Sequence, residues 1–388
     1  MHKIFKYKIQ YLIFIYFLIP TLQFTGFIFI NLKVLLFFGV IIFLFLYKFL
    51  KQSVKIKYTD IFLFSIIVIY ISIHITYSIL NSTVIGNAYF YIKLLSGVLL
   101  YFLIIYSNEE LNRKIWYHLI IISIVVAFLQ QFPYTRQIMM SLYGSVQGYI
   151  SNFPYSRASG LTVGFYIYTQ VIMLMMLLYK LSVNNKKVSK KFNLFVFIGS
   201  LLSNTRSTFL LPFYYLFLEL KFVHKIIIGI LVFIAFLYLV NNFSPIKTVY
   251  HHLYLVYKSG NLNPILESQN SSFSQRVSDI FWFFDLIKTD EIKMIFWGMG
   301  AHIAQGQEIG YFLIFTKVGI LLSLIFYFMP LTIVFFYLKF KKSIRFLILI
   351  LPILLADLLV SGFVKYDLYI LYWVFTAFYI KYNKEIRN

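Results

Sequence analysis

Four arginines lie in polar segments that we expect on the outer side of a membrane: Arg136, Arg157, Arg206 and Arg276. A guanidinium group presents a planar fork of N–H donors that matches phosphate oxygens, and it stays charged when it is partly desolvated. Such groups suit a lipid-linked diphosphate, whose charge must be stabilised when it departs from a sugar. Each arginine taken singly is also explained by an ion pair at the rim of the protein, so both interpretations stay open.

Glu308 is distinguished from the other outer acids by its position. It lies where the longest polar segment meets a new apolar run, and it is flanked by Gly306 and Gly310, which permit close approach of the backbone. A carboxylate desolvated at such a point could act as a general base towards a sugar hydroxyl. The alternative is an acid at a helix N-terminus that complements the helix dipole.

Four further ionisable residues interrupt predicted membrane helices near their outer ends. They are His74, Lys93, Lys317 and Asp357, each within about eight residues of that end, and such groups usually face a cavity when they lie within a bilayer. A hydrated cavity open to the outside would explain the clustering. Alternatively, Lys93 and Lys317 extend to the lipid headgroups and Asp357 pairs with a local partner.

Several other chemistries find no support in the residues. The sequence contains no cysteine, which excludes disulfides and thiolate metal sites. It has no P-loop, dinucleotide fingerprint, HExxH motif or acidic cluster typical of a divalent metal, and His251 and His252 point to different faces of a helix. We therefore predict neither a metal nor a cofactor.

The composition indicates an integral membrane protein. The chain has 388 residues, of which 61% are hydrophobic and 12% charged, whereas soluble domains carry roughly 25% charged residues. Its net charge of +22 is spread over short segments between apolar runs, and does not form the basic face of a nucleic-acid binder. Orientation in the bilayer explains most of it.

A helix needs about 20 apolar residues to cross a bilayer. On this basis the sequence predicts an all-α integral membrane protein with about twelve transmembrane helices. The predicted ranges are 9–30, 33–50, 58–80, 88–106, 115–132, 161–180, 192–204, 206–220, 226–243, 309–329, 346–362 and 366–380. With both termini in the cytoplasm, about 23 of the 35 Lys and Arg residues fall in cytoplasmic segments, as the positive-inside rule requires. One polytopic domain over 1–388 is the simplest organisation.

The longest outer segment spans about 244–308 and contains apolar positions at helical spacing. Residues 246–258 predict an amphipathic helix lying at the membrane interface. A second helix is predicted to start near Ser272, because Gln275 follows three residues later in a capping-box pattern. We expect this segment to cap the outer face of the membrane domain.

Taken in order, several short segments resemble a known family. They are 157–161 (RASGL), 203–207 (SNTRS), 271–276 (SSFSQR), 297–300 (WGMG), 308–312 (EIGYF) and 317–320 (KVGI). Together with the predicted topology they resemble the O-antigen and capsular repeat-unit polymerases of the Wzy type, and their relatives the O-antigen ligases. The motifs cover roughly 150–330, and the topology covers the whole chain.

The resemblance implies a metal-independent glycosyltransferase of the bacterial cytoplasmic membrane that needs no cofactor. Such a polymerase joins undecaprenyl-pyrophosphate-linked repeat units into a surface polysaccharide, and it works beside a chain-length regulator and a flippase. Carried onto this chain, Arg157, Arg206, Arg276 and Lys317 would bind the pyrophosphates. Glu308, with Arg206 and Arg276, would carry the catalysis.

Two other functions remain open. Glu308 stands where the ligases have a histidine, which favours a polymerase over a ligase. A flippase for lipid-linked oligosaccharide would show charges in both leaflets, short loops on both faces and repeated halves. The long outer segment and the one-sided intramembrane charges favour the polymerase.

Overall fold

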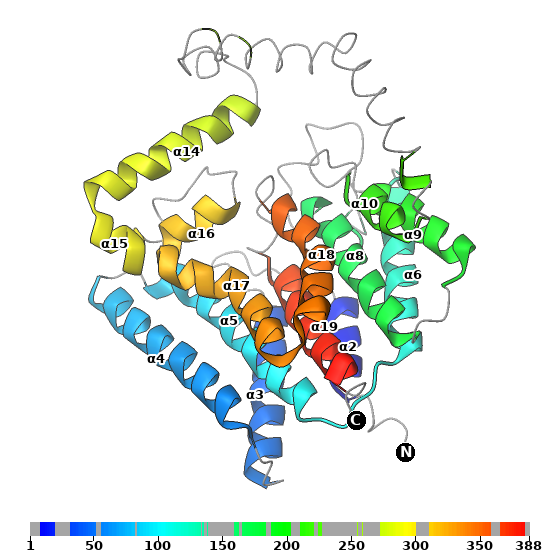
Figure 1. Cartoon of the computed structure of the whole chain (residues 1–388), viewed down its shortest axis with the longest axis horizontal. Coiled ribbons are helices and arrows are strands. Elements are labelled where there is room, and N and C mark those ends of the chain that lie inside the picture. The colour runs from blue at the N-terminus through cyan, green and yellow to red at the C-terminus, as the bar shows by residue number, and fades with distance from the viewer. Residues whose placement is uncertain are drawn as a thin grey trace.

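The computed structural model describes the greater part of the chain. The described residues are 8–19, 32–51, 56–81, 84–132, 134–135, 138, 159–162, 165–183, 188–202, 210–220, 224–226, 254, 258, 272–299, 310–357 and 365–384. Within these ranges the regular structure is all helical (Figure 1).

The described helices differ in length, from a single short turn region to more than twenty residues. In chain order they are α2 (Lys8–Leu18), α3 (Leu32–Lys51), α4 (Tyr58–Leu80), α5 (Val84–Ile105), α6 (Arg113–Leu129), α8 (Phe165–Ser182), α9 (Lys190–Leu201), α10 (Leu210–Glu219), α14 (Ser272–Thr289), α15 (Glu291–Phe296), α16 (Gly310–Val318), α17 (Ile320–Tyr337), α18 (Phe340–Ala356) and α19 (Tyr366–Lys384). Figure 1 shows α14 and α15 at one edge of the bundle formed by the others.

Most of the predicted helices that fall on described residues are found close to their expected places. The ranges 33–50 and 58–80 correspond to α3 and α4, and the helix predicted near Ser272 is α14, which begins at that residue. The predicted helices at 226–243 and 246–258 lie outside the described elements. Four of the described helices are long and apolar enough to cross a membrane, namely Leu32–Leu50, Tyr58–Leu80, Ala88–Ile105 and Ile320–Tyr337, which indicates a multi-pass membrane protein.

The single helix predicted over 309–329 is wrong. The chain instead forms α16 and α17, which are separated by Gly319 with φ 85°. That angle lies in the left-handed region, which only glycine adopts at little cost, and it ends one helix before the next begins. An apolar run shows where a helix can cross a membrane, but a single glycine inside the run decides where the helix breaks. The helix predicted at 346–362 is also shifted, since α18 runs from Phe340 to Ala356.

The exposed faces of α3 and α4, which point away from the rest of the bundle, are apolar. Phe43 on α3 is 67% exposed and Phe62 on α4 is 65% exposed, and both belong to continuous apolar faces. Exposed apolar area of this extent is uncharacteristic of a surface that meets water. Such a surface is suited to contact with lipid chains.

The most completely buried helix is α19. From Tyr366 to Ile380 every residue is buried, and α5 and α8 pack along it (Figure 1). The aromatic rings of Phe326 on α17 and Tyr369 on α19 stack with centroids 3.9 Å apart. At Gly97 the backbone of α5 approaches the buried Trp373 ring so closely that a methyl carbon there would lie 2.3 Å from Trp373 Cδ1.

Hydrogen bonds join several helix ends on one side of the bundle. We call this side, which contains Lys342 and Lys381, the basic end. Lys381 Nζ at the end of α19 donates to Ser107 O at 2.5 Å and to Glu109 O at 2.7 Å, in the connection between α5 and α6. Ile9 N at the start of α2 donates to Glu109 Oε1 at 2.8 Å. Lys342 Nζ near the start of α18 donates to Asn383 O at 2.7 Å. The start of α2, the α5–α6 connection and the end of α19, all in segments predicted to be cytoplasmic, therefore share one end of the molecule.

A buried carboxylate joins the start of α4 to the ends of α5 and α17 there. Asp60 in the first turn of α4 is 1% exposed. It accepts hydrogen bonds from the hydroxyl of Tyr106, which follows α5, and from that of Tyr337 at the end of α17. Both oxygens of the carboxylate are thus engaged, which satisfies the rule that a buried charge must be hydrogen bonded.

We expect Gly97→Ala to destabilise the protein. The added methyl group would overlap the Trp373 ring, and overpacking of this kind costs about 1–3 kcal/mol, which exceeds the helix-propensity gain of about 1 kcal/mol. Gly39→Ala is the matched control, because nothing lies within 4 Å of a methyl carbon at that helical glycine. Thermal unfolding in detergent should show a lower Tm for Gly97→Ala only. Equal Tm values for the two variants would contradict the close packing of α5 on α19.

A second prediction concerns Glu109, which is 6% exposed. Burial raises the pKa of its carboxyl above the ordinary 4.5, and the hydrogen bond from Ile9 N lowers it only in part. The folded state therefore retains this proton to a higher pH than the unfolded chain does, so the free energy of unfolding falls as the pH rises above 4.5.

Glu109→Gln removes that titration, so its Tm should fall less than the parent's as the pH is raised. Thermal unfolding measured from acidic to neutral pH checks this, with Glu110→Gln as the control that removes the same charge from an exposed neighbour. Parallel Tm curves for the parent and Glu109→Gln would show that this carboxyl has the same proton affinity in both states.

Candidate functional site

The described part of the motif segment 297–300 meets the motif segment 317–320 at the break between α16 and α17. Met299 N donates to Thr316 O at 2.6 Å. Gly298 and Gly319 both have positive φ, at 73° and 85°, and their backbones are in direct contact. A methyl carbon at Gly298 would lie 2.5 Å from Gly319 N, and one at Gly319 would lie 2.8 Å from Phe296 C. The contact therefore requires glycine on both sides.

His74 on α4 holds this junction together. Its Nε2 lies 2.9 Å from Val318 O and 3.1 Å from Trp297 O, and its Nδ1 lies 2.5 Å from the hydroxyl of Tyr91 on α5. Carbonyl oxygens only accept hydrogen bonds, so we assign the proton to Nε2, and Nδ1 then accepts from Tyr91. Both nitrogens of this fully buried ring are occupied by protein groups.

Stacking of aromatic rings supports the same junction. The Tyr77 ring on α4 lies parallel to the Trp297 indole, with centroids 4.3 Å apart and an interplanar angle of 13°. Tyr70 OH, one helical turn before His74, donates to Phe296 O at 3.0 Å. One face of α4 therefore binds the chain that links α15 to α16, and this fixes the end of the long polar segment on the bundle.

Next to the junction, three lysines from different elements come within electrostatic range of one another. Lys93 lies on α5, Lys317 in the last turn of α16 and Lys365 immediately before α19. Lys93 feels the charges of both other lysines, and Lys317 feels that of Lys365. Like charges repel one another, so bringing these three side chains into one region costs free energy.

Lys93 is enclosed by protein and does not reach the surface. It is 2% exposed, and its Nζ lies 4.7 Å from the centroid of the Tyr89 ring. The negative face of the ring attracts the ammonium group. Lipid headgroups are therefore out of reach of Lys93, contrary to the alternative considered from the sequence.

The carboxylate of Asp357 faces the same region. It is fully buried at the end of α18 and accepts a hydrogen bond of 2.6 Å from Tyr327 OH on α17. Its charge acts on Lys93 in the favourable sense. Tyr311 on α16 packs against Tyr327 with ring centroids 4.3 Å apart. Asp357 thus has a local partner, as one of the two sequence interpretations expected, and it also belongs to the charged cluster.

A second buried pair of opposite charges lies at the first turn of α19. Asp367 Oδ1 accepts a hydrogen bond of 2.5 Å from Tyr16 OH on α2, and its charge attracts Lys33 on α3. Lys33 is 3% exposed, and its Nζ lies 4.4 Å from the centroid of the Tyr16 ring. The Tyr16 ring beside it and the Asp367 carboxylate at longer range both favour the charge of this ammonium group, which has no hydrogen-bond partner among the described residues.

The turn before α8 is fixed by one glutamine. Gln130 Oε1, just past the end of α6, accepts hydrogen bonds from Ser159 N at 2.8 Å and Gly160 N at 3.0 Å. Gly160 has φ 55° and lies against the Tyr168 ring. The described part of the segment 157–161 is thus attached to the bundle at the end opposite the basic end.

Of the five residues to which the sequence assigned a catalytic or pyrophosphate-binding role, Lys317 is described in full. Its charge acts on Lys93, and His74 lies against the neighbouring Val318. Arg276 lies on α14, but its side chain is outside the description, and Arg157, Arg206 and Glu308 lie outside the described residues altogether. The proposed roles of these four stay predictions.

Lys33 and Lys365 were missed as site residues. Each stands at the start of an apolar helix at the end opposite the basic end, which is the signal that could have found them. From sequence alone such lysines are indistinguishable from those that extend into the headgroup region. Their relation to Asp367 and Lys93 requires knowing how helices far apart in the chain pack.

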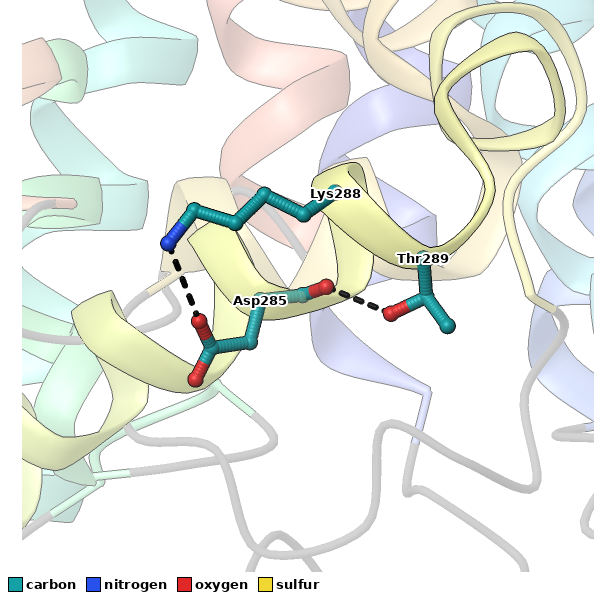
Figure 2. A network of polar contacts seen from close by, with 3 residues as sticks. All are labelled: Asp285, Lys288 and Thr289. Atoms are coloured by element: carbon teal, nitrogen blue, oxygen red, sulfur yellow. Dashed lines mark hydrogen bonds and ion pairs between the residues drawn. The ribbon is translucent and has the colours of Figure 1, made fainter.

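The exposed face of α14 provides a contrast. Figure 2 shows Lys288 Nζ 3.4 Å from Asp285 Oδ1, with Thr289 Oγ1 donating to the Asp285 carbonyl at 2.5 Å. The two charged side chains are 79% and 71% exposed, and exposed pairs of this kind contribute about 0–1 kcal/mol. Lys288 is therefore a suitable control for the buried lysines.

Among the described residues there is no group of three or more His, Asp or Glu side chains that could hold a metal ion. The cluster at the end opposite the basic end instead carries three ammonium groups and the Asp357 carboxylate. Ammonium groups donate hydrogen bonds and carry no free electron pair for a metal ion.

Comparison with protein-family models, with curated proteins and with solved structures gave no match. What the chain does must therefore follow from its own residues and from the motifs described above.

We expect His74→Leu to loosen the junction between the long polar segment and the bundle. Two buried carbonyls would lose their donor, at a cost of about 1–3 kcal/mol for each unsatisfied group. His118→Leu removes an exposed histidine, whose Nδ1 contacts only the Lys114 carbonyl within its own helix, and serves as the control. Limited proteolysis should cleave the chain near residue 300 faster in His74→Leu alone. Identical cleavage rates would exclude a clamping role for His74.

Proposed function

We propose that this protein is a polymerase that joins lipid-diphosphate-linked oligosaccharide repeat units into a surface polysaccharide, on the outer side of the bacterial cytoplasmic membrane. The lipid carrier is undecaprenyl pyrophosphate, and the product is O-antigen or capsule. No metal or cofactor takes part, because the departing diphosphate supplies the energy for the new glycosidic bond.

The observation that carries this proposal is the cluster of Lys93, Lys317, Lys365 and Asp357. It lies at the end of the bundle opposite the basic end, and it holds more positive than negative charge among its described members. A substrate with an apolar tail and a diphosphate head suits such a place, because its tail stays in lipid while its head meets ammonium groups. A neutral sugar acceptor alone would not require this charge.

The reaction needs one base and several cations. The acceptor sugar hydroxyl attacks the anomeric carbon of the donor, its proton passes to the base, and the bond to the diphosphate oxygen breaks. In our proposal Glu308 takes the proton, and Arg206 and Arg276 stabilise the departing diphosphate. Arg157 and Lys317 hold the phosphates in place.

The junction at Gly298 and Gly319 supports a function for the long polar segment 244–308. The chain that follows α15 is tied to α4 and to the break between α16 and α17 by His74 and Trp297. In the proposed arrangement the segment forms a cap over the charged cluster. In the sequence, Glu308 stands between this junction and the start of α16.

The proposed topology has about twelve crossings, and the basic end faces the cytoplasm. The gathering of Lys and Arg residues at that end supports this orientation. The charged cluster then lies in the outer leaflet, where lipid-linked repeat units arrive after a flippase has moved them. A chain-length regulator is the second expected partner.

Deletion of the gene provides the test. We expect the deletion strain to display surface glycan with a single repeat unit, because export and ligation continue while polymerisation stops. Gel electrophoresis of the glycan and mass spectrometry of lipid-linked intermediates measure this. Absence of surface glycan with trapped lipid-linked units would indicate a flippase, and polymer retained on the lipid carrier would indicate a ligase.

Complementation with variants tests the assigned residues. Arg206→Ala, Arg276→Ala and Glu308→Gln should each fail to restore long chains, while Lys288→Ala should restore them because its ion pair is exposed. Membrane abundance of each variant is measured by immunoblot, so that loss of protein is separated from loss of activity. Normal chain length in both arginine variants would refute the arginine assignments.

A further inference from the structure

We propose that α15 and the turn that follows it, residues 291–299, form a re-entrant segment that lies among the acyl chains of the bilayer leaflet at the end opposite the basic end. Its partner is lipid, which the side chains of Ile292 and Phe296 contact. The inference is independent of the proposed polymerase reaction, because it concerns only how the chain after α14 meets the bilayer.

The first argument is depth along α4. This helix has 23 residues, so it is about 34 Å long, close to the thickness of about 30 Å of a hydrocarbon core. Its contacts with the segment come from Tyr70, His74 and Tyr77. With a rise of about 1.5 Å per residue, these positions lie about 15 Å, 9 Å and 4.5 Å before the last residue of α4. The end of α15 is therefore at the depth of acyl chains.

The second argument is how the backbone at the end of α15 is hydrogen bonded. Trp297 N and Gly298 N both donate to Lys293 O, at 2.8 Å and 2.7 Å. The carbonyls of Phe296 and Trp297 accept hydrogen bonds from side chains of α4. Backbone that leaves the helical path within a hydrocarbon core is tolerated only where protein satisfies its polar groups. In an aqueous loop water would serve these carbonyls, so the donors supplied by α4 match a place from which water is absent.

The third argument is the exposed surface of α15. Ile292 is 71% exposed and Phe296, one turn later, is 42% exposed. On α4 the exposed Ile69 and Ile73 lie about 60–100° around the helix axis from Tyr70, which binds the Phe296 carbonyl. They belong to the apolar face of α4 that is suited to lipid, so α15 extends a surface that already meets acyl chains.

The fourth argument is the change of polarity along the chain. Asp285 and Lys288 near the end of α14 form an exposed ion pair (Figure 2), and Glu291 at the start of α15 is exposed. The six residues of α15 extend over about 9 Å from this charged start to Phe296. Helices at a membrane interface insert their apolar side about 5–10 Å below the headgroups. The segment therefore leads from the headgroup region into the acyl chains.

Spin labelling in a bilayer tests the proposal. The sequence contains no cysteine, so one introduced cysteine can carry a nitroxide label in the full-length protein. In phosphatidylcholine nanodiscs, labels at Ile292→Cys and Phe296→Cys should be relaxed more strongly by oxygen, which concentrates among acyl chains, than by a water-soluble nickel chelate. The matched neighbour Glu291→Cys should show the reverse preference. Phe62→Cys on the apolar face of α4 provides the reference for lipid.

The two labels should also differ in depth. Phe296 follows Ile292 by four residues, so its label should lie deeper, by up to about 6 Å. The Tm of each labelled variant shows whether the fold is kept. Because Ile292 is mostly exposed, its label decides the matter if Phe296→Cys lowers the Tm.

Other outcomes would overturn the proposal. Labels at both positions that respond to the two reagents as the Glu291→Cys label does would place α15 in water. Labels shielded from both reagents would show that protein, and not lipid, covers the surface. Dipolar broadening that disappears on dilution with unlabelled protein would then identify a second copy of the chain as the partner. None of these results depends on whether the protein polymerises a glycan.

Discussion

The cost of placing an ammonium group inside an apolar bundle shapes this structure. An isolated charge is strongly destabilising in a medium of low dielectric constant, so each buried lysine needs an acid, a ring of carbonyls, an aromatic face or a ligand. Lys381 has carbonyls of the α5–α6 connection, and Lys33 has Asp367 and the Tyr16 ring. Lys93 has the Tyr89 ring and Asp357, and it shares its region with two more lysines.

The two ends of the bundle use buried polar groups differently. At the basic end Asp60 and Glu109 join helix termini, since each carboxylate accepts hydrogen bonds from residues of other helices. Those contacts are the kind that fix an architecture. At the other end the buried carboxylates of Asp357 and Asp367 each accept a hydrogen bond from a tyrosine and act on a buried lysine.

Close packing connects the two ends. The buried helix α19 carries Asp367 at its first turn and Lys381 near its last, and Trp373 between them fills the space left by Gly97. Because protein interiors are packed densely and resist deformation, the position of one end of α19 determines that of the other. The residues at its N-terminus are therefore held by the same core that holds the basic end.

The junction at Gly298 and Gly319 joins the end of the long polar segment to this core. The two backbones approach so closely that a side chain on either glycine would prevent the contact. His74 stabilises it further by donating to the carbonyls of Trp297 and Val318. The contact therefore fixes the residues that follow α15 on the bundle.

The sequence by itself determined the class of protein and the approximate place of most described helices, because a run of apolar residues long enough to cross a bilayer is a local property. It also indicated that Lys93, Lys317 and Asp357 lie near one end, since their depth within predicted helices can be counted along the chain. Only the tertiary structure decided that Gly319 breaks a helix, that His74 binds the carbonyls of Trp297 and Val318, and that Lys365 joins Lys93 and Lys317. Those outcomes depend on which helix faces meet, and helix packing in a uniformly apolar sequence is decided by shape, small residues and buried hydrogen bonds that no single segment contains.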